Sequence, residues 1–439
     1  MTQAKVQTNG YVGQSIPRRE DRRLLTGRGQ FVADLKLPDT LHAVFVRSQL
    51  AHARIRSVDL SRALKAPGVV YALAGAELIK ILPPVPDTQL SLPRKWTTQV
   101  QHTFLNPQQP LLAHDKVRHV GEAVAVILAE SRYLAEDAAE LVTVDLEPLP
   151  ALVDPEEALK PGAPVLHDKY GTNLIGEFRV AKGDVEAALK RAPHRLKRRF
   201  YTHRYAAIPM ECRGVISTYD ERADSITIWS SCQVVHWLRR EASTVLNMPE
   251  ARIRAVALDV GGGFGVKGHV YPEELLIPFL ARTVKRPVRW IEDRHEHFMS
   301  ACHSRDQIHD VEAGFDDQGR LLAFRDSFIA DCGAWNPIGA GIAYNTAVHL
   351  PGPYKFEHFA VQARIATTCK VPNAPYRGAG RPEATFAIER IMDELAVELD
   401  MDPLELRRKN WIGAQEFPFT TVAGLEYDSG DYDEATRQA

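Results

Sequence analysis

The chain has 439 residues, of which 45% are hydrophobic and 25% are charged, a composition typical of globular proteins. Its 54 basic and 56 acidic side chains give a formal net charge of −2, which provides no general attraction to nucleic acid or anionic membranes. Because no apolar run approaches the roughly 18 residues needed to span a bilayer, and residues 1–15 lack a secretory signal pattern, we expect a cytoplasmic protein without a membrane span.

The first third of the chain, residues 15–150, is predicted to form one α/β domain. Strand patterns occur at residues 41–46, 120–128 and 142–146, and a helical pattern at residues 131–142 lies between the last two. This order predicts a β-α-β unit. The proline-rich stretch from Glu147 to Pro164 is interpreted as a linker.

Residues 165–415 are predicted to form a second domain in which strands and helices alternate. Strands are predicted at residues 196–203, 225–230, 252–260, 288–291, 308–315, 321–330 and 361–367, and helices at residues 235–246, 271–284 and 382–399. Asp184 is the predicted N-cap of a short helix, and residues 316–319 are a predicted hairpin turn. The last segment, residues 416–439, is polar and begins like a helix without establishing an apolar face.

Two glycine-rich loops, far apart in the chain, carry the main functional signal. The first loop is residues 261–268 (GGGFGVKG) and the second is residues 375–382 (PYRGAGRP), each between a predicted strand and a predicted helix. Glycine lets a backbone approach a ligand closely. A helix start offers unpaired N–H groups and a positive dipole end, which suit an anion. We therefore predict that the two loops hold one large anionic ligand from two sides.

The first loop also satisfies the pattern GxGxxG at Gly263, Gly265 and Gly268, with Glu292 about 20 residues further on. This pattern is found in dinucleotide folds, so an NAD-dependent dehydrogenase is one alternative. The position of the loop deep in the chain, its additional glycines and a helix that starts only near Tyr271 count against it.

No cluster of metal ligands stands out. The five cysteines are scattered without a CxxC pair, so they are interpreted as buried free thiols rather than as disulfides or iron–sulfur ligands. The run His295-Glu296-His297 does not match HExxH and is interpreted as a surface feature.

A set of longer motifs occurs in one order along the chain: RREDRRLLTG at 18–27, SQLAHARI at 48–55, VGEAVA at 120–125, SSCQ at 230–233, GGGFG at 261–265 and YRGAGR at 376–381. In these motifs the chain resembles the molybdenum-binding large subunits of the xanthine dehydrogenase, aldehyde oxidase and carbon monoxide dehydrogenase family. The resemblance implies a mixed α/β and α+β architecture. Residues 15–150 would be an aldehyde oxidase-type α/β hammerhead domain and residues 165–415 the first of two molybdopterin-binding domains. Residues 416–439 would be a C-terminal tail or the start of the second.

In that family a pterin dithiolene, not a protein side chain, holds the molybdenum. The resemblance implies that Gln233 hydrogen-bonds an oxo ligand of the metal. It implies no direct bond between the metal and a side chain of this chain. The other implied cofactor contacts come from the two loops: Gly262, Gly263, Phe264, Gly265, Arg377, Gly378 and Ala379. The implied cofactor is molybdopterin, with its cytosine dinucleotide form favoured because bacterial members often use it.

The chain departs from two branches of the family. Gly378 takes the place of the cysteine that holds copper in carbon monoxide dehydrogenases. Gly268 and Ala379 take the places of a glutamate and a phenylalanine that contact purine in xanthine dehydrogenases. The loops instead resemble those of the aldehyde-oxidising, form II-like members, which implies an aldehyde or an N-heteroaromatic substrate.

No residue here corresponds to the glutamate that acts as general base in the family, so we expect no catalytic residue in this chain. Glu273 and Glu274 lie in the first turn of a predicted helix and are interpreted as partners of its dipole. The base is expected on a second molybdopterin-domain subunit, through a natural split or a truncated gene. The resemblance implies that partner subunits carrying [2Fe–2S] clusters and FAD take the electrons. The alternative is a non-catalytic remnant or assembly module that binds partners without cofactor.

Overall fold

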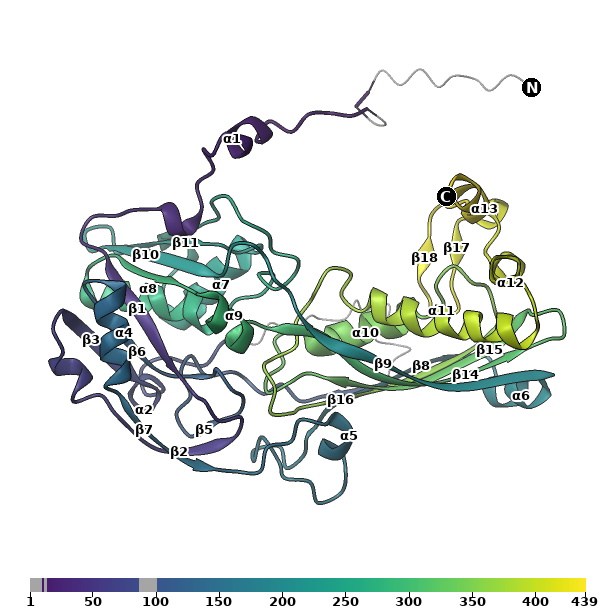
Figure 1. The fold of residues 1–439 in the computed structure, drawn as a ribbon, viewed down its shortest axis with the longest axis horizontal. Coiled ribbons are helices and arrows are strands. Elements are labelled where there is room, and N and C mark those ends of the chain that lie inside the picture. Colours follow the sequence, from purple (N-terminus) through teal and green to yellow (C-terminus); the bar gives the residue numbers. More distant parts are fainter. Residues whose placement is uncertain (1–9, 12–13, 87–100) are drawn as a thin grey trace.

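The computed structural model describes residues 10–11, 14–86 and 101–439, and these form two lobes, each built on one large sheet (Figure 1). Residues 87–100 of the predicted first domain, and most of the N-terminal segment in which no secretory signal was found, lie outside the described residues. Within the described ranges, no helix is both long and apolar enough to cross a membrane.

The first lobe contains a mixed sheet with seven strands in the described part of the chain. Their spatial order is β12 (Ile253–Val256), β11 (Ser225–Ser230), β10 (Gly214–Asp220), β13 (Val288–Ile291), β1 (Leu41–Arg47), β6 (Ala123–Ala129) and β3 (Val69–Ala74). β1 lies parallel to β13, with Leu41 opposite Val288, so the sheet joins strands from the two halves of the sequence. The helices of this lobe are α2 (Gly75–Leu78), α4 (Arg132–Glu140), α7 (Val235–Leu246), α8 (Pro272–Val284) and α9 (Arg294–Ser300).

A three-stranded antiparallel sheet lies beside β6, in the order β5 (Lys116–Val117), β2 (Ala53–Asp59) and β7 (Thr143–Pro148). The predicted β-α-β unit is wrong, because β6 and β7 belong to different sheets although α4 connects them. The burial pattern gives the reason. β6 is buried along its whole length, whereas β7 is half exposed and pairs antiparallel with β2.

The predicted linker is more ordered than expected. It contains the short helix α5 (Pro155–Ala158), whose N-cap Asp154 accepts hydrogen bonds from two backbone N–H groups. The buried side chain of Asn173 donates to the carbonyls of Ala158 and Pro164 at 3.0 and 2.9 Å. These contacts fix the connection against the second lobe.

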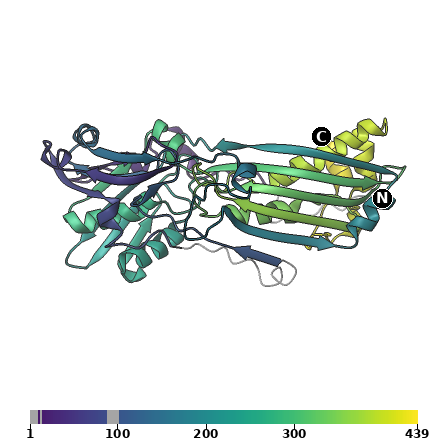
Figure 2. The ribbon, with the colours of Figure 1, turned by 90° about the horizontal axis from the view of Figure 1, so that it is seen from below.

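The second lobe contains a six-stranded sheet in the described residues. Its order is β4 (Gln101–Phe104), β8 (Leu174–Lys182), β16 (His358–Ala366), β15 (Leu321–Asp331), β14 (His303–Phe315) and β9 (His194–Ala206). Figure 2 shows its long strands lying side by side. Helices α10 (Gly339–His349) and α11 (Arg381–Glu398) cover one face (Figure 1). On α11, Ala384, Ile388, Ile391 and Leu395 recur at helical spacing and are fully buried, which explains why this helix packs on the sheet.

The remaining α-helices and strands of the described chain are α1 (Asp21–Leu25), α6 (Val185–Arg191), α12 (Pro403–Asn410), β17 (Phe419–Thr420), β18 (Glu426–Tyr427) and α13 (Tyr432–Gln438). Asp184 caps α6 as predicted, accepting from the N–H of Ala187. The hairpin turn between β14 and β15 and the helix predicted at residues 382–399 are also confirmed. The strand predicted at residues 252–260 is wrong beyond Val256, where β12 ends.

Candidate functional site

The two glycine-rich loops meet where the two lobes join. The first loop follows β12 of the seven-stranded sheet, and the second follows β16 of the six-stranded sheet. The backbone N–H of Arg377 donates to the carbonyl of Phe264 at 2.9 Å. A Cβ on Gly265 would lie 2.3 Å from the carbonyl oxygen of Pro375, so this approach requires glycine. The two loops are therefore in contact, as the prediction of one shared ligand requires.

Gln233, between β11 and α7, joins the first loop. Its backbone N–H donates to the carbonyl of Lys267 at 2.8 Å, and its side-chain Oε1 accepts from the N–H of Gly265 at 2.9 Å. A Cβ on Gly263 would lie 2.4 Å from that oxygen, so a larger residue there would displace the Gln233 side chain. Because the amide oxygen is engaged by the loop, the amide NH2 group of the exposed Gln233 is left to donate to a ligand.

Where the two loops meet, the backbone is strained and has several free N–H groups that can donate hydrogen bonds. Phe264 and Ala379 have φ values of 54° and 44°, a left-handed conformation that is uncommon outside glycine and recurs at functional sites. Within the described chain, the N–H groups of Gly263, Phe264 and Gly378 have no acceptor. Phe264 and Gly378 are exposed, so their N–H groups suit an anion or a polarised oxygen.

A buried ion pair that the sequence analysis did not predict holds the first loop in place. The Nζ of Lys267, whose side chain is only 1% exposed, lies 2.9 Å from Oε2 of Glu211. The same carboxylate oxygen accepts from the N–H of Gly261 at 2.8 Å. Burial lowers the pKa of Lys267, and the charge of Glu211 opposes that shift. The only signal in the sequence was a lysine inside a glycine-rich run.

Three side chains from other elements surround the second loop. Arg305 of β14 donates from Nη2 to the carbonyl of Arg377 at 2.9 Å, and Asn345 of α10 donates to the carbonyl of Ala379. Glu383, in the first turn of α11, pairs with Arg305. The exposed guanidinium of Arg377 has no partner among the described residues, which leaves a positive charge at the junction of the loops.

Comparison with known proteins identifies these domains. Residues 26–150 match the family described as aldehyde oxidase and xanthine dehydrogenase, a/b hammerhead domain. Residues 166–411, more than half of the chain, match the molybdopterin cofactor-binding domain. The chain belongs to the xanthine dehydrogenase, aldehyde oxidase and carbon monoxide dehydrogenase family.

Similar proteins cover nearly the whole chain. It is 38% identical to the 6-hydroxypseudooxynicotine dehydrogenase complex subunit gamma of Paenarthrobacter nicotinovorans, over 96% of this chain and 53% of that protein. It is 33% identical to the carbon monoxide dehydrogenase large chain of Hydrogenophaga pseudoflava, with the same coverage. Quinoline 2-oxidoreductase from Pseudomonas putida 86 has 36% identity and a TM-score of 0.89, over 97% of this chain and 55% of that one. The chain spans about half the length of these relatives.

These matches confirm the predicted fold class, a hammerhead domain followed by a molybdopterin-binding domain. The geometry of the first loop does not suit the alternative of an NAD-binding fold. In such folds the glycine turn leads directly into the helix whose N-terminus holds the pyrophosphate. Here α8 begins only at Pro272, after Gly268, and β12 is an edge strand of its sheet.

A cluster of buried charges lies behind the first loop of this family member. Arg213 pairs with Glu292 at 2.5 Å and with Glu273 at 3.3 Å, and Glu273 also pairs with Arg47 of β1 at 2.7 Å. Glu273 and Glu274 lie in the first turn of α8 as predicted, and they are also buried. The cluster ties β1 to α8 and to the residue that precedes β10.

The surface interpretation of the run from His295 to His297 is wrong for His297, which is 1% exposed on the inner side of α9. Its Nδ1 lies 2.7 Å from a carboxylate oxygen of Glu292 and its Nε2 lies 2.9 Å from the carbonyl of Ala207. With Cys212, Glu292 and His297 form a group compact enough to consider as a metal site. Because both ring nitrogens already face protein acceptors, the group is better explained as internal hydrogen bonding.

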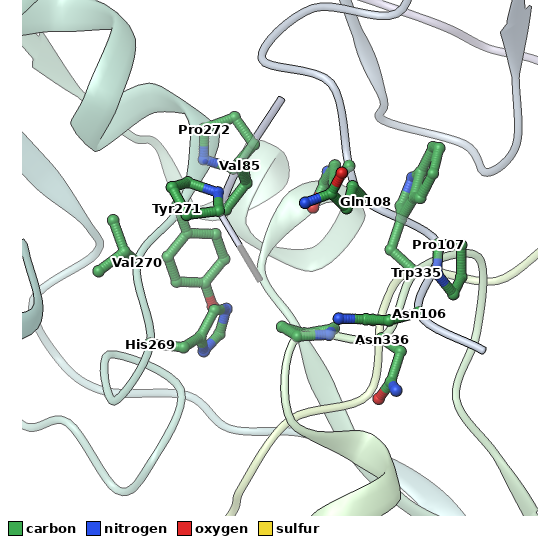
Figure 3. A pocket seen from close by; sticks show the side chains of 13 residues that line it. Val85, Asn106, Pro107, Gln108, His269, Val270, Tyr271, Pro272, Trp335 and Asn336 are labelled. Carbon is green, nitrogen blue, oxygen red and sulfur yellow. The ribbon is translucent and has the colours of Figure 1, made fainter. Parts of the chain in front are cut away.

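A small cavity of about 40 Å³ lies beyond the end of the first loop (Figure 3). It is lined by His269–Pro272, Asn106–Gln109 and Trp335–Pro337, together with Val85 and Pro86. Burial lowers the pKa of His269 to about 3 and raises that of its neighbour Cys302 to about 12, so both are neutral at pH 7. The volume suits one or two water molecules rather than an aromatic ring.

Four cysteines are buried as predicted, and Cys212 is half-buried.

Proposed function

We propose that this chain supplies the cofactor-holding half of a molybdenum hydroxylase site. The proposed cofactor contacts are Gln233, Gly262, Gly263, Phe264, Gly265, Arg377, Gly378 and Ala379. The observation that carries the proposal is the hydrogen bond between Arg377 and Phe264, which brings both loops to one exposed edge. When bound, molybdopterin would supply a redox-active molybdenum centre for oxidation with oxygen from water.

The residues of this edge fit such a group. The amide NH2 of Gln233 would donate to a ligand of the metal without adding charge. The free N–H groups of Phe264 and Gly378, the guanidinium of Arg377 and the positive end of α11 would hold the anionic parts of the cofactor. We favour its cytosine dinucleotide form.

The general base is proposed to come from outside these 439 residues. Among the described residues, no carboxylate hydrogen-bonds to Gln233, Phe264 or Arg377. Exposed apolar side chains, among them Ile208 at 57% and Met210 at 93%, lie in the segment whose residues Pro209 and Glu211 contact the first loop, and they favour docking of another domain. We propose that a second molybdopterin-binding domain covers this face, and that subunits with [2Fe–2S] clusters and FAD accept the electrons in the cytoplasm.

The proposed substrate is an N-heteroaromatic compound or an aldehyde. Two of the similar proteins, by their names, act on compounds with a nitrogen-containing aromatic ring, the pseudooxynicotine derivative and quinoline. Gly378 and Ala379 of the second loop are small residues, and we propose that they leave space for a flat ring beside this loop.

Metal and cofactor analysis of the purified complex that contains this chain tests the proposal. We expect one molybdenum and one pterin per chain. Gln233→Ala should lower turnover by about 10²-fold, as loss of one positioned donor does in other enzymes, whereas the matched control Gln362→Ala should not. Gln362 is a surface glutamine whose Nε2 donates to Glu177 at 2.6 Å. A complex without molybdenum and pterin would contradict the proposal and favour a non-catalytic assembly module.

A further inference from the structure

A local distortion of β14 lies directly behind the second loop. Arg305 and Asp306 have φ values of 69° and 67°, so two consecutive non-glycine residues are left-handed. β14 pairs with β9 through Arg305 opposite Arg204 and Gln307 opposite Thr202, and the pairing is interrupted at Asp306. This conformation is unfavourable and persists only where its surroundings fix it.

Buried and partly buried polar contacts fix the distortion. The carboxylate of Asp306 lies 2.6 Å from Arg204 and 2.9 Å from Lys370. The carbonyl of Arg305 accepts from the side chain of Asn373 at 2.6 Å. In a regular strand the side chain of residue 305 would point in another direction. The contacts that fix the distortion therefore also fix the direction of the Arg305 side chain.

The Arg305 guanidinium reaches the end of the second loop. Its side chain is 7% exposed and lies over the ring of Tyr376, 5.2 Å from the ring centre. Nη2 donates to the carbonyl of Arg377 at 2.9 Å, and Nη1 donates to Glu383 at 3.0 Å. One planar group therefore joins the loop to the first turn of α11.

The carbonyl that Arg305 holds belongs to the same peptide unit as the free N–H of Gly378. A peptide unit is planar and trans, so its C=O and N–H point in opposite directions. Gly378 has a φ of 103° and no Cβ, which makes rotation of this unit easy. Fixing the carbonyl of Arg377 on Arg305 therefore aims the N–H of Gly378 away from the protein interior.

We propose that Arg305 is a positioning residue that sets the orientation of the Arg377–Gly378 peptide unit and so aims its N–H at the cofactor. The identity of the ligand rests on the proposed function, whereas the orientation of the peptide unit does not. Arg305→Lys would keep a positive charge beside Glu383 but would lose the fork that binds the carbonyl and the carboxylate together.

Two measurements on Arg305→Lys test this role. In the full chain, hydrogen exchange at the amides of Arg377 and Ala379, which are bonded to Phe264 and Tyr376, should become about ten-fold faster because a charge-assisted hydrogen bond is lost. Exchange in α12 should not change, which separates a loop effect from general destabilisation. In the complex, release of the pterin should also become about ten-fold faster.

The matched control is Arg407→Lys, because Arg407 is also a partly buried arginine, paired with Glu389 at 2.7 Å and Asp393 at 2.8 Å. It should leave both rates unchanged. If Arg305→Lys does not fold, Glu383→Gln weakens the same fork and should give a smaller acceleration of both rates. If the amides of the second loop exchange at the wild-type rate in these variants, the inference is overturned. A wild-type complex without pterin would instead refute the proposed function, while the exchange rates would still decide the role of Arg305.

Discussion

The first glycine-rich loop is held by residues of other loops, whereas the second is held by side chains from a strand and a helix of the second lobe. Lys267 of the first loop pairs with Glu211 below it, and Gly265 binds Gln233. The second loop depends on Arg305 of β14 and Asn345 of α10. The comparison shows that a glycine pattern marks where a backbone must come close, but that other residues decide how it is oriented.

The two loops also differ in what lies behind them. Behind the first loop, Arg213, Glu273 and Glu292 form a buried charge cluster. Behind the second, the helix α11 begins at Arg381, after its N-cap Gly380, which has the left-handed conformation with φ of 92°. We therefore expect substitutions near the first loop to change global stability, and substitutions near the second loop to change mainly local order.

The largest expected effect is at the contact between the loops. Gly265→Ala adds a Cβ 2.3 Å from a backbone oxygen at φ of 103°, and should lower the free energy of unfolding by about 4 kcal/mol. Gly162→Ala is the matched control, because Gly162 has φ of 78° and no atom within 4 Å of its added Cβ, so about 1–2 kcal/mol is expected. Urea unfolding of both variants measures the difference. Equal losses would mean that the loops do not need this contact.

The next effect concerns the cluster behind the first loop. Glu292→Gln leaves Arg213 buried with one charge partner fewer, and should destabilise the chain by about 3 kcal/mol at pH 7. Burial alone would raise the pKa of Glu292, but the charge of Arg213 and the hydrogen bond from His297 hold it well below its usual value.

The pH dependence of that effect has a definite sign. With a lowered pKa in the folded state, Glu292 stabilises fully above the unfolded pKa of about 4.3, and this stabilisation falls by about 1.4 kcal/mol per pH unit below it. The difference between wild type and Glu292→Gln should therefore shrink in urea unfolding below about pH 4.3. The exposed pair of Glu157 and Lys160 provides the control, since Glu157→Gln should change little at any pH. A difference that grows in acid would contradict the assignment.

A smaller effect is expected at the ion pair inside the first loop. Lys267→Met leaves Glu211, whose side chain is 15% exposed, without its cation, and should lower the free energy of unfolding by about 2 kcal/mol. Because an apolar pair can replace a buried ion pair, adding Glu211→Gln should recover part of the loss. Additive losses in this double-mutant cycle would show that the two residues do not act together.

The smallest effect is expected at the second loop. Asn345→Ala removes the donor to the carbonyl of Ala379 and should lower the free energy of unfolding by about 1 kcal/mol. Hydrogen exchange at the amides of residues 377–381 should increase, with little change in α8. A uniform increase over both lobes would show that the second loop is not locally controlled.

Much of the site could be predicted because the backbone conformations that it needs select particular residue types in the local sequence. Gly265 and Gly378 have positive φ values, and glycine is the residue type that such positions select. Asp184 and the helix α11 were predicted for the same reason, since caps and helical spacing are local patterns. The approach of Arg377 to Phe264 followed once both loops were assigned to one ligand.

The residues that hold the loops could not be predicted, because their contacts join distant parts of the chain. Arg305 lies 72 residues before the carbonyl that it binds, and Glu211 lies 50 residues before Gly261. The burial of His297 depends on which side of α9 faces the protein interior, which a seven-residue helix with mixed residues does not reveal. The separation of β6 and β7 into two sheets likewise depends on β2, which no short-range pattern connects to β7.

The most direct test of the account is anomalous X-ray diffraction from crystals of the purified complex at the molybdenum absorption edge. We expect one peak per chain, beside the amide of Gln233 and the peptide edge of Phe264, with pterin density reaching toward Arg377 and Gly378. A peak remote from both loops, or no peak in crystals of the active complex, would contradict the central claim that the two loops hold one cofactor.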